Sequence, residues 1–144
     1  MPNWNEAEFE VVGDKEVIDE ILKTDFDFDK IRPEPQDLME QPDVPNESMI
    51  KMGFKDATSP AWYEWRLKNW GTKWKPTREN NNLDLNRVSN TKLNVIMTTA
   101  WCLPIEILKF LTFKYPVSIA GTTREETEDH SLAFVVEKGA IRGQ

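Results

Sequence analysis

The chain has 144 residues, of which 39% are hydrophobic and 30% are charged, so residues 1–144 are expected to form one domain that needs no disulfide or metal to hold its core. Its single cysteine excludes an intramolecular disulfide framework and a zinc site built from cysteines. There is no apolar run of membrane-spanning length and no signal-peptide pattern, so we expect a cytoplasmic protein with no membrane contact.

The net charge of −7 is distributed unevenly along the chain. Residues 1–50 hold fifteen acidic and four basic residues, whereas residues 51–118 hold eleven basic and five acidic ones. An acidic region beside a basic one can steer a charged partner over long range. The alternative is that the acidic residues only keep the surface soluble.

The first twelve residues predict a half-buried strand, because apolar and acidic residues roughly alternate along them. The apolar set is Trp4, Ala7, Phe9 and Val11, and the acidic set is Glu6, Glu8 and Glu10. Gly13 ends the strand, and Asp14 is the expected N-cap of a helix over Lys15–Lys23. These acidic side chains form a candidate binding surface, which comprises Glu6, Glu8, Glu10, Asp14 and Glu16.

An aspartate-rich segment and a long insertion follow the first helix. The aspartates of DFDFD, from Asp25 to Asp29, are spaced like calcium ligands, but the pattern lacks the required glycine, and Gln36 stands where a glutamate is needed. We therefore expect no metal site and place Phe26 and Phe28 in the core. Residues 33–56 contain four prolines and few large apolar groups, which predicts an acidic, proline-rich surface insertion.

Four of the six tryptophans lie in the block from Ser59 to Trp74. Ser59 is the expected N-cap of a helix, Pro60 its first residue and Gly71 its C-terminal stop. The helical spacing predicts one packing face, made by Tyr63, Leu67 and Trp70. A strand over Thr72–Lys75 is expected next, with Trp70 and Trp74 in the core.

The second half of the chain predicts four further strands and one helix. The strands are Leu83–Val88, Leu93–Trp101, Val117–Ala120 and Leu132–Val136, and the helix is Ile105–Phe113. Thr122–His130 is expected to be a polar loop, and Ile141–Gln144 a frayed tail. The element order predicts an α+β, ferredoxin-like fold: a β-α-β-β-α-β antiparallel sheet with two helices on one face, an inserted acidic arm plus tryptophan-rich helix, and one extra C-terminal strand.

The residues that carry most enzyme chemistry are sparse. His130 is the only histidine and lies in an acidic stretch, Cys102 is expected to be a small buried residue, and no glycine-rich phosphate loop occurs. We therefore predict a protein that is not an enzyme, with no catalytic residue and no cofactor. The alternative site combines aromatic and basic side chains, on which nucleic acid or a small ligand could stack: Lys73, Trp74 and Trp101.

Four motifs together resemble the YubB-type ferredoxin-like domain family of phages, prophages and conjugative plasmids. They are MPNW (1–4), FDFDKIRPEP (26–35), NWGTKW (69–74) and TTAWCLPIEIL (98–108). Two positions depart from the family pattern: Asn5 replaces a frequent cysteine, and a single Pro104 replaces a proline pair. The resemblance implies an accessory protein of a mobile element that acts in the host cytoplasm. Combined with the acidic surface, it predicts binding to a host protein, with a defence nuclease as the concrete candidate.

Overall fold

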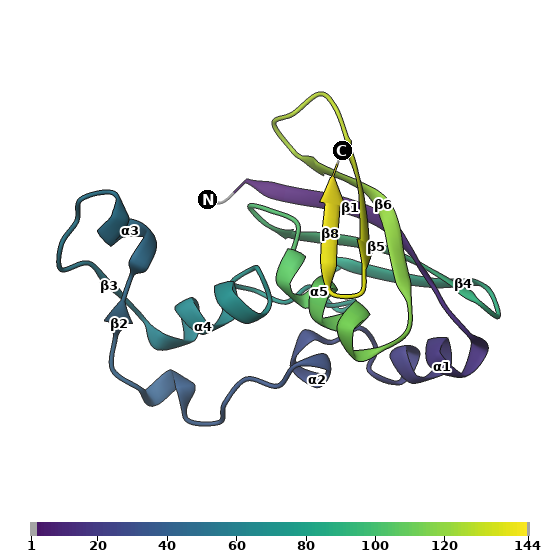
Figure 1. Ribbon diagram of the computed structural model, residues 1–144, viewed down its shortest axis with the longest axis horizontal. Helices are drawn as coiled ribbons and strands as arrows, with labels where there is room; N and C mark the ends of the chain where they lie inside the picture. Colours follow the sequence, from purple (N-terminus) through teal and green to yellow (C-terminus); the bar gives the residue numbers. More distant parts are fainter. Residues whose placement is uncertain (1–2, 144) are drawn as a thin grey trace.

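The computed structural model of the protein describes residues 3–143 and contains one six-stranded antiparallel sheet (Figure 1). Its strands are β1 (Trp4–Val12), β4 (Leu83–Ser89), β5 (Lys92–Ala100), β6 (Ser118–Glu125), β7 (Leu132–Glu137) and β8 (Ala140–Gly143). Their spatial order is β4-β5-β1-β6-β7-β8, so β1 lies in the middle and pairs with β5 and β6. The predicted antiparallel α+β architecture is thereby confirmed.

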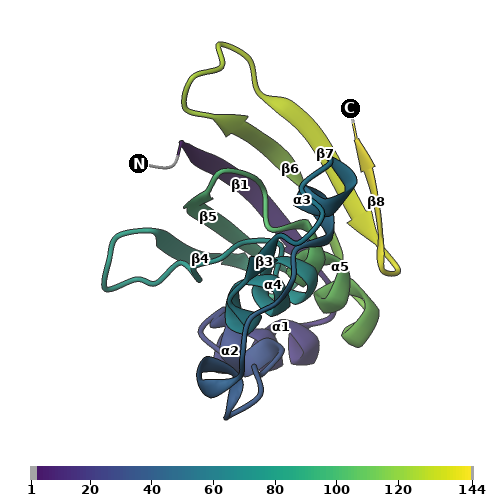
Figure 2. The same ribbon diagram turned by 90° about the vertical axis from the view of Figure 1, so that its left-hand side faces the viewer.

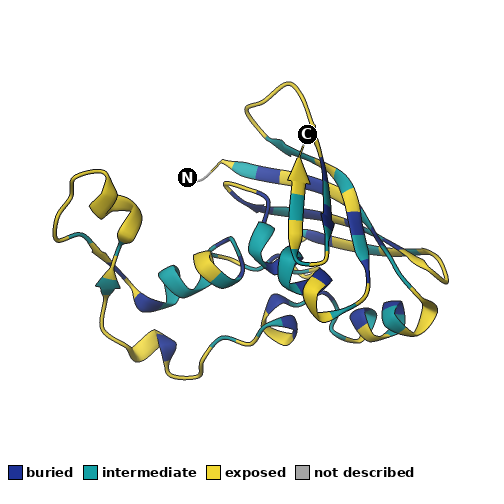
Figure 3. Ribbon diagram, viewed as in Figure 1, coloured by how far each residue is buried: buried dark blue, intermediate teal, exposed yellow. Residues whose placement is uncertain are grey.

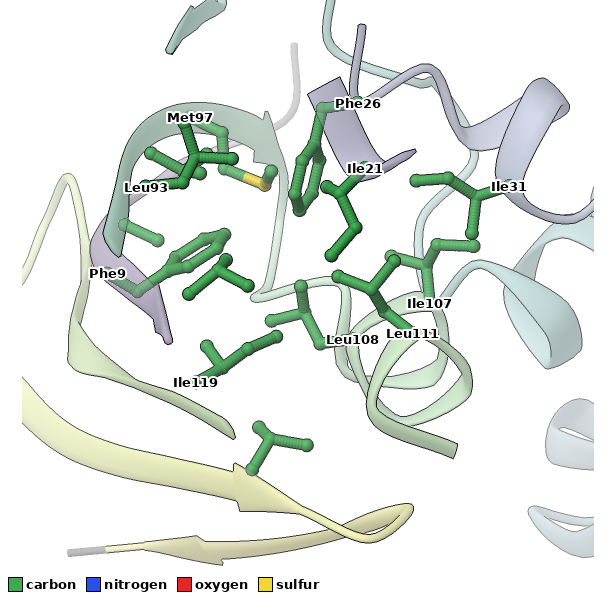
Figure 4. Close-up of a cluster of buried hydrophobic side chains, with 14 of the residues drawn as sticks. Phe9, Ile21, Phe26, Ile31, Leu93, Met97, Ile107, Leu108, Leu111 and Ile119 are labelled. Atoms are coloured by element: carbon green, nitrogen blue, oxygen red, sulfur yellow. The ribbon is translucent and has the colours of Figure 1, made fainter. Parts of the chain in front are cut away.

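Helices cover one face of this sheet and leave the other face open (Figure 1). They are α1 (Lys15–Lys23), α2 (Phe28–Ile31) and α5 (Ile105–Lys114), whereas α4 (Ala61–Asn69) packs against α5 on the side of the arm. The odd-numbered residues of β1 are buried, because side chains of a strand alternate between its two faces. They join the apolar sides of the helices in one core, which includes Phe9, Ile21, Phe26, Ile31, Leu108, Leu111 and Ile119 (Figure 4). Each such side chain contributes about 1.5–3 kcal/mol when fully buried.

The strict two-residue period of β1 corrects the predicted position of Trp4. Asn5, and not Trp4, continues the buried side of the strand, and its Oδ1 accepts a hydrogen bond from Thr123 Oγ1 at 2.8 Å. That bond satisfies the buried amide oxygen. Trp4 therefore points to the same side as the strand glutamates.

The C-terminal third contains more strand than predicted. β6 continues through the segment that was predicted to start a loop at Thr122, because residues 118–125 pair with β1 along its length. The expected frayed tail forms β8, which pairs with β7, whereas Gln144 lies outside the described residues. Two strands thus follow β6 where one was expected, and the strand order differs from that of the predicted plan.

Gly121 allows two aromatic rings to meet across three strands. It pairs with Phe9 of β1 on one side and with Phe134 of β7 on the other. A Cβ atom at this glycine would lie 2.5 Å from Phe9 Cα and 2.1 Å from the Glu8 carbonyl oxygen, so no side chain fits. The ring centroids of Phe9 and Phe134 lie 6.1 Å apart in an edge-to-face arrangement, which is a favourable aromatic geometry.

The tryptophan block folds differently from its prediction after the helix. α4 begins one residue later than expected, with Pro60 as its N-cap, and Trp70 lies just beyond its last residue. The helical period therefore does not extend to Trp70, and Leu67 is exposed instead of packed. The strand expected over Thr72–Lys75 is absent, since Thr72, Lys73 and Trp74 form bends and Lys75 has no regular structure, and side-chain contacts described below fix this path.

The insertion at 33–56 is an arm that extends away from the sheet (Figures 1 and 2). It contains short elements of its own: η1 (Leu38–Glu40), β2 (Val44–Pro45), α3 (Glu47–Lys51) and, just after it, β3 (Thr58–Ser59). Most of its residues are exposed (Figure 3). Among its apolar side chains Leu38 is buried, whereas several others are exposed: Met39, Met49, Ile50, Met52 and Phe54.

Candidate functional site

The open face of the sheet carries the three strand glutamates. Glu6 and Glu8 are exposed and Glu10 is partly exposed, on the side of β1 opposite the buried Phe9. By register, their neighbours are Thr98, Ile96 and Asn94 on β5 and Arg124, Thr122 and Ala120 on β6. We call this surface the open acidic face. It is centred on the three glutamates Glu6, Glu8 and Glu10.

The charges of the open acidic face are only partly compensated. Arg124 Nη2 donates to Glu6 Oε2 at 3.0 Å, and Asn94 Nδ2 donates to Glu8 Oε2 at 3.4 Å. Ile96 lies opposite Glu8 and is exposed, which places an apolar side chain among the carboxylates. Glu8 and Glu10 thus remain available to a cationic partner.

Two further predicted acidic residues belong to a different part of the molecule. Asp14 is the N-cap of α1, as predicted, although its side chain makes no capping hydrogen bond, and Glu16 lies in the first turn of that helix. Because α1 packs on the opposite face from the strand glutamates, Asp14 and Glu16 do not join the open acidic face.

The other predicted site residues do meet in space. Lys73 Nζ lies 4.2 Å from the ring centroid of Trp74 and 5.2 Å from that of Trp101. Trp4 joins them, with its ring centroid 6.3 Å from that of Trp74. We call Trp4, Lys73, Trp74 and Trp101 the tryptophan–lysine cluster. Since Trp4 shares its side of β1 with Glu6, the cluster borders the open acidic face.

The segment that carries Lys73 and Trp74 is held at several points. Gly71 has a φ of +85° and ends α4, and its N–H donates to the Arg66 carbonyl oxygen at 3.0 Å. Thr72 Oγ1 donates to the Ala100 carbonyl oxygen at 3.4 Å, and Lys75 Nζ donates to Asp27 Oδ1 at 2.9 Å. These contacts replace the regular ladder of the predicted strand.

Arg66 is the main anchor of this segment. Its guanidinium binds Glu34 through two hydrogen bonds of 2.7 and 3.0 Å and donates a third, of 3.0 Å, to the Lys73 carbonyl oxygen. It also lies 4.8 Å from the ring centroid of Trp62. A bidentate pair of this kind is geometrically specific, so Arg66 ties the arm, α4 and the cluster together.

Trp101 adopts a strained backbone conformation while its side chain remains 57% exposed. Its φ is +74°, in the left-handed region that bulky residues rarely occupy, and its N–H donates to the Asn3 carbonyl oxygen at 2.7 Å. Such strain persists only when the surrounding structure holds it, and it is found frequently at functional sites. It marks Trp101 as a candidate binding residue.

Four sequence predictions about single residues have clear outcomes. Trp70 is buried, as expected, and its Nε1 donates to the Arg32 carbonyl oxygen at 3.0 Å, but Trp74 is 44% exposed and is not a core residue. His130 is exposed, as predicted. Cys102 as a residue is exposed, contrary to prediction. Its sulfur, however, lies 3.4 Å from the Gly71 carbonyl oxygen and is partly covered, and this local desolvation raises the pKa of the thiol.

Sequence reasoning missed Trp4 and Arg66 as members of the site. A strict period of two along β1 would have placed Trp4 with the glutamates, because its number is even like theirs. No local pattern indicates Arg66, since its partners Glu34 and Lys73 are brought to it by the fold.

No family model, curated protein or solved structure matches the chain. Within residues 3–143, no three His, Cys, Asp or Glu side chains lie together in an arrangement suited to a metal ion. No helix in the described part of the chain is long and apolar enough to cross a membrane.

Proposed function

We propose that the protein binds a basic surface on a protein partner through the open acidic face and modulates that partner without catalysing a reaction. The observation that carries this proposal is that Glu6, Glu8 and Glu10 stand side by side on an uncovered sheet face. Carboxylates spaced along a strand attract cations, raise the association rate and select against acidic partners.

The neighbouring tryptophans support an interface rather than a merely soluble surface. Trp74 and Trp101 are substantially exposed, and Trp74 contacts Trp4, which lies on the same side of β1 as Glu6. Tryptophan is among the residues that contribute most to protein–protein binding, and such residues are effective when a ring of polar groups surrounds them. An acidic stripe with aromatic anchors at one end fits a basic partner with an apolar spot.

We further propose that the sheet contains a ferredoxin-like core and that the protein is a phage or mobile-element accessory factor. Four strands, β4-β5-β1-β6, support the first part. β1 and β4 lie on either side of β5, and α1 follows β1, which is consistent with one split β-α-β unit. β5 and β6 lie on either side of β1, and α5 connects them, which is consistent with a second such unit. The motif resemblance supports the second part, with a host protein as partner. Carboxylates presented in place of phosphates suit a defence nuclease.

The test is charge reversal with a matched control. The triple variant Glu6→Lys, Glu8→Lys and Glu10→Lys is compared with Glu40→Lys, Asp43→Lys and Glu47→Lys, which changes the net charge equally but on the arm. Immobilised protein is exposed to lysate of the host bacterium at low and high salt. We expect one partner that the wild type and the arm variant retain and that high salt or the sheet variant releases. Equal capture by both triple variants would refute the open acidic face as the interface.

A second function is favoured by one observation, the approach of Lys73 Nζ to the ring centroids of both Trp74 and Trp101, at 4.2 and 5.2 Å. This arrangement supports a ligand-binding role for the tryptophan–lysine cluster, with single-stranded nucleic acid as one ligand to test. Labelled oligonucleotides are mixed with the wild type and with Lys73→Glu at low salt. A mobility shift that the variant loses would support this role for nucleic acid, and no shift would exclude it.

A further inference from the structure

We propose that the tryptophan–lysine cluster is a binding site for a compact organic cation, a quaternary ammonium group above all, and that Lys73 occupies this site in the free protein. This inference goes beyond the proposed function, because the site exists whether or not the open acidic face binds a protein. It assigns the cluster a ligand of positive charge, so this inference and the nucleic-acid role described above are alternatives for the same site.

The geometry is that of an ammonium group held by aromatic rings. Lys73 Nζ lies within 5.2 Å of the centroids of both Trp74 and Trp101. Cations are attracted to the negative face of an aromatic ring at distances up to about 6 Å, and indole is the best of the side-chain rings. Trp4 stands beside Trp74 and extends the aromatic surface.

The surroundings of the cluster favour positive charge. Glu126 Oε1 accepts a hydrogen bond of 3.0 Å from the Trp4 N–H, and Glu125 Oε1 accepts one of 2.7 Å from Asn3 Nδ2. Glu6 follows two residues after Trp4 on the same side of β1. Within residues 3–143, Lys73 forms no ion pair, so its ammonium is held by the rings. Arg66 and Lys75 also lie beside Trp74, but each is paired with a carboxylate, Glu34 for Arg66 and Asp27 for Lys75, so neither offers a free positive charge to a phosphate there.

The backbone that carries the site is anchored, whereas the lysine side chain that occupies the site is not. The Lys73 backbone is anchored by Arg66 through the carbonyl oxygen, and the Trp101 backbone is anchored by Asn3. The Lys73 side chain is a flexible stem that is only partly buried. It can rotate into solvent without moving the backbone and leave the ring faces free for another cation. Because a quaternary ammonium is less strongly hydrated than a lysine ammonium, it loses less on leaving water.

The experiment uses the full chain and three variants: Lys73→Ala, Trp74→Leu and the doubly substituted Lys73→Ala, Trp74→Leu. Each is titrated with choline chloride against sodium chloride at equal ionic strength, and tryptophan fluorescence and indole N–H chemical shifts are recorded. We expect saturable binding to the wild type, about tenfold tighter binding to Lys73→Ala, where the internal competitor is gone, and loss of binding in both variants that lack Trp74. Thermal unfolding of each variant verifies that it is folded.

A neutral control separates charge recognition from simple apolar contact. 3,3-Dimethylbutanol has the shape of choline without its charge, and we expect it to bind at least tenfold more weakly to Lys73→Ala. Equal binding of the two compounds would overturn the proposal, as would a folded Lys73→Ala that binds no choline. A peptide with trimethyllysine, compared with its unmodified form, then distinguishes a protein-borne cation from a free one.

Discussion

The tryptophan–lysine cluster and the tip of the arm both expose large apolar side chains, but the fold holds them in different ways. In the arm, Met52 is 72% exposed and directly follows α3, which lies far from the sheet (Figure 1). In the cluster, Trp74 and Trp101 are exposed on a segment that is anchored by Arg66 and by a strained turn.

This difference separates two meanings of an exposed apolar residue. The arm side chains are exposed because little of the chain lies near them. The cluster rings are exposed although the surrounding backbone is fixed, and one of them, Trp101, is held at a positive φ that is unfavourable for its side chain. Anchored exposure therefore indicates a binding site more strongly than exposure alone. The comparison can be tested by stability measurements on matched variants.

The largest effect is expected from Arg66→Ala. It removes both hydrogen bonds to Glu34 and the one to the Lys73 carbonyl oxygen, and it leaves a partly buried carboxylate without its partner. We expect a loss of about 3 kcal/mol in the free energy of unfolding, measured by urea denaturation. Met52→Ala in the arm should cost less than about 0.5 kcal/mol. Similar losses in the two variants would show that the cluster is no better anchored than the arm.

A smaller difference is expected between two glycines that share a positive φ. Gly71 beside the cluster has a φ of +85° and Gly53 in the arm one of +104°. A Cβ at Gly71 would lie 3.0 Å from the backbone nitrogens of Ile105 and Glu106, whereas one at Gly53 meets nothing within 4 Å. Gly71→Ala should cost about 2–3 kcal/mol and Gly53→Ala about 1 kcal/mol. Equal losses of stability in Gly71→Ala and Gly53→Ala, measured by thermal unfolding, would show that the backbone around Gly71 is not closely packed.

The smallest effect concerns Cys102 at the base of the cluster. Burial raises the pKa of its thiol above the ordinary value of 9.0. The thiol is therefore neutral at pH 8 and should react with iodoacetamide more slowly than a cysteine placed in the arm by Ser48→Cys together with Cys102→Ser.

The raised pKa of the Cys102 thiol also determines whether the free energy of unfolding rises or falls with pH. The unfolded chain ionises its thiol first, so the folded protein should lose a little stability as pH rises above 9.0, and the loss should level off once the folded thiol also ionises. Thermal unfolding at pH 7 and pH 10 measures this loss, with Cys102→Ser as the control in which it is absent. If Cys102→Ser lost as much stability between pH 7 and pH 10 as the wild type does, the loss would belong to another titrating group.

The sequence predicted most of the sheet and the helices that pack on it. The alternation of Glu6, Glu8 and Glu10 with apolar residues places them correctly on one face, because a strand has only two sides. The periods of α1 and α5 were equally informative, since both helices bury one side against the core. These elements depend on local pattern alone.

The remaining features depend on contacts between distant residues. The bends at Thr72–Lys75 are set by Gly71, Arg66 and Asp27, and no window of the sequence contains all of these partners. β8 forms because β7 offers it an edge, although its own residues look like a tail. Cys102 is exposed because the chain leaves the sheet at Trp101. The sequence predicts Lys73, Trp74 and Trp101 as one candidate site, but the contact of the ammonium with both rings depends on the tertiary fold.

Gly121 couples the substitutions that three positions of the sheet can accept. Phe9, Gly121 and Phe134 lie in one cross-strand row in which the missing side chain gives room to two rings. The side-chain volumes at these three positions are therefore interdependent, because a larger side chain at one position leaves less room at the other two. A side chain at position 121 would clash with the Glu8 carbonyl oxygen, so it could be accepted only if β1 and β6 moved apart. We therefore expect related chains to keep this glycine even where the exposed glutamates of the same strand have been replaced.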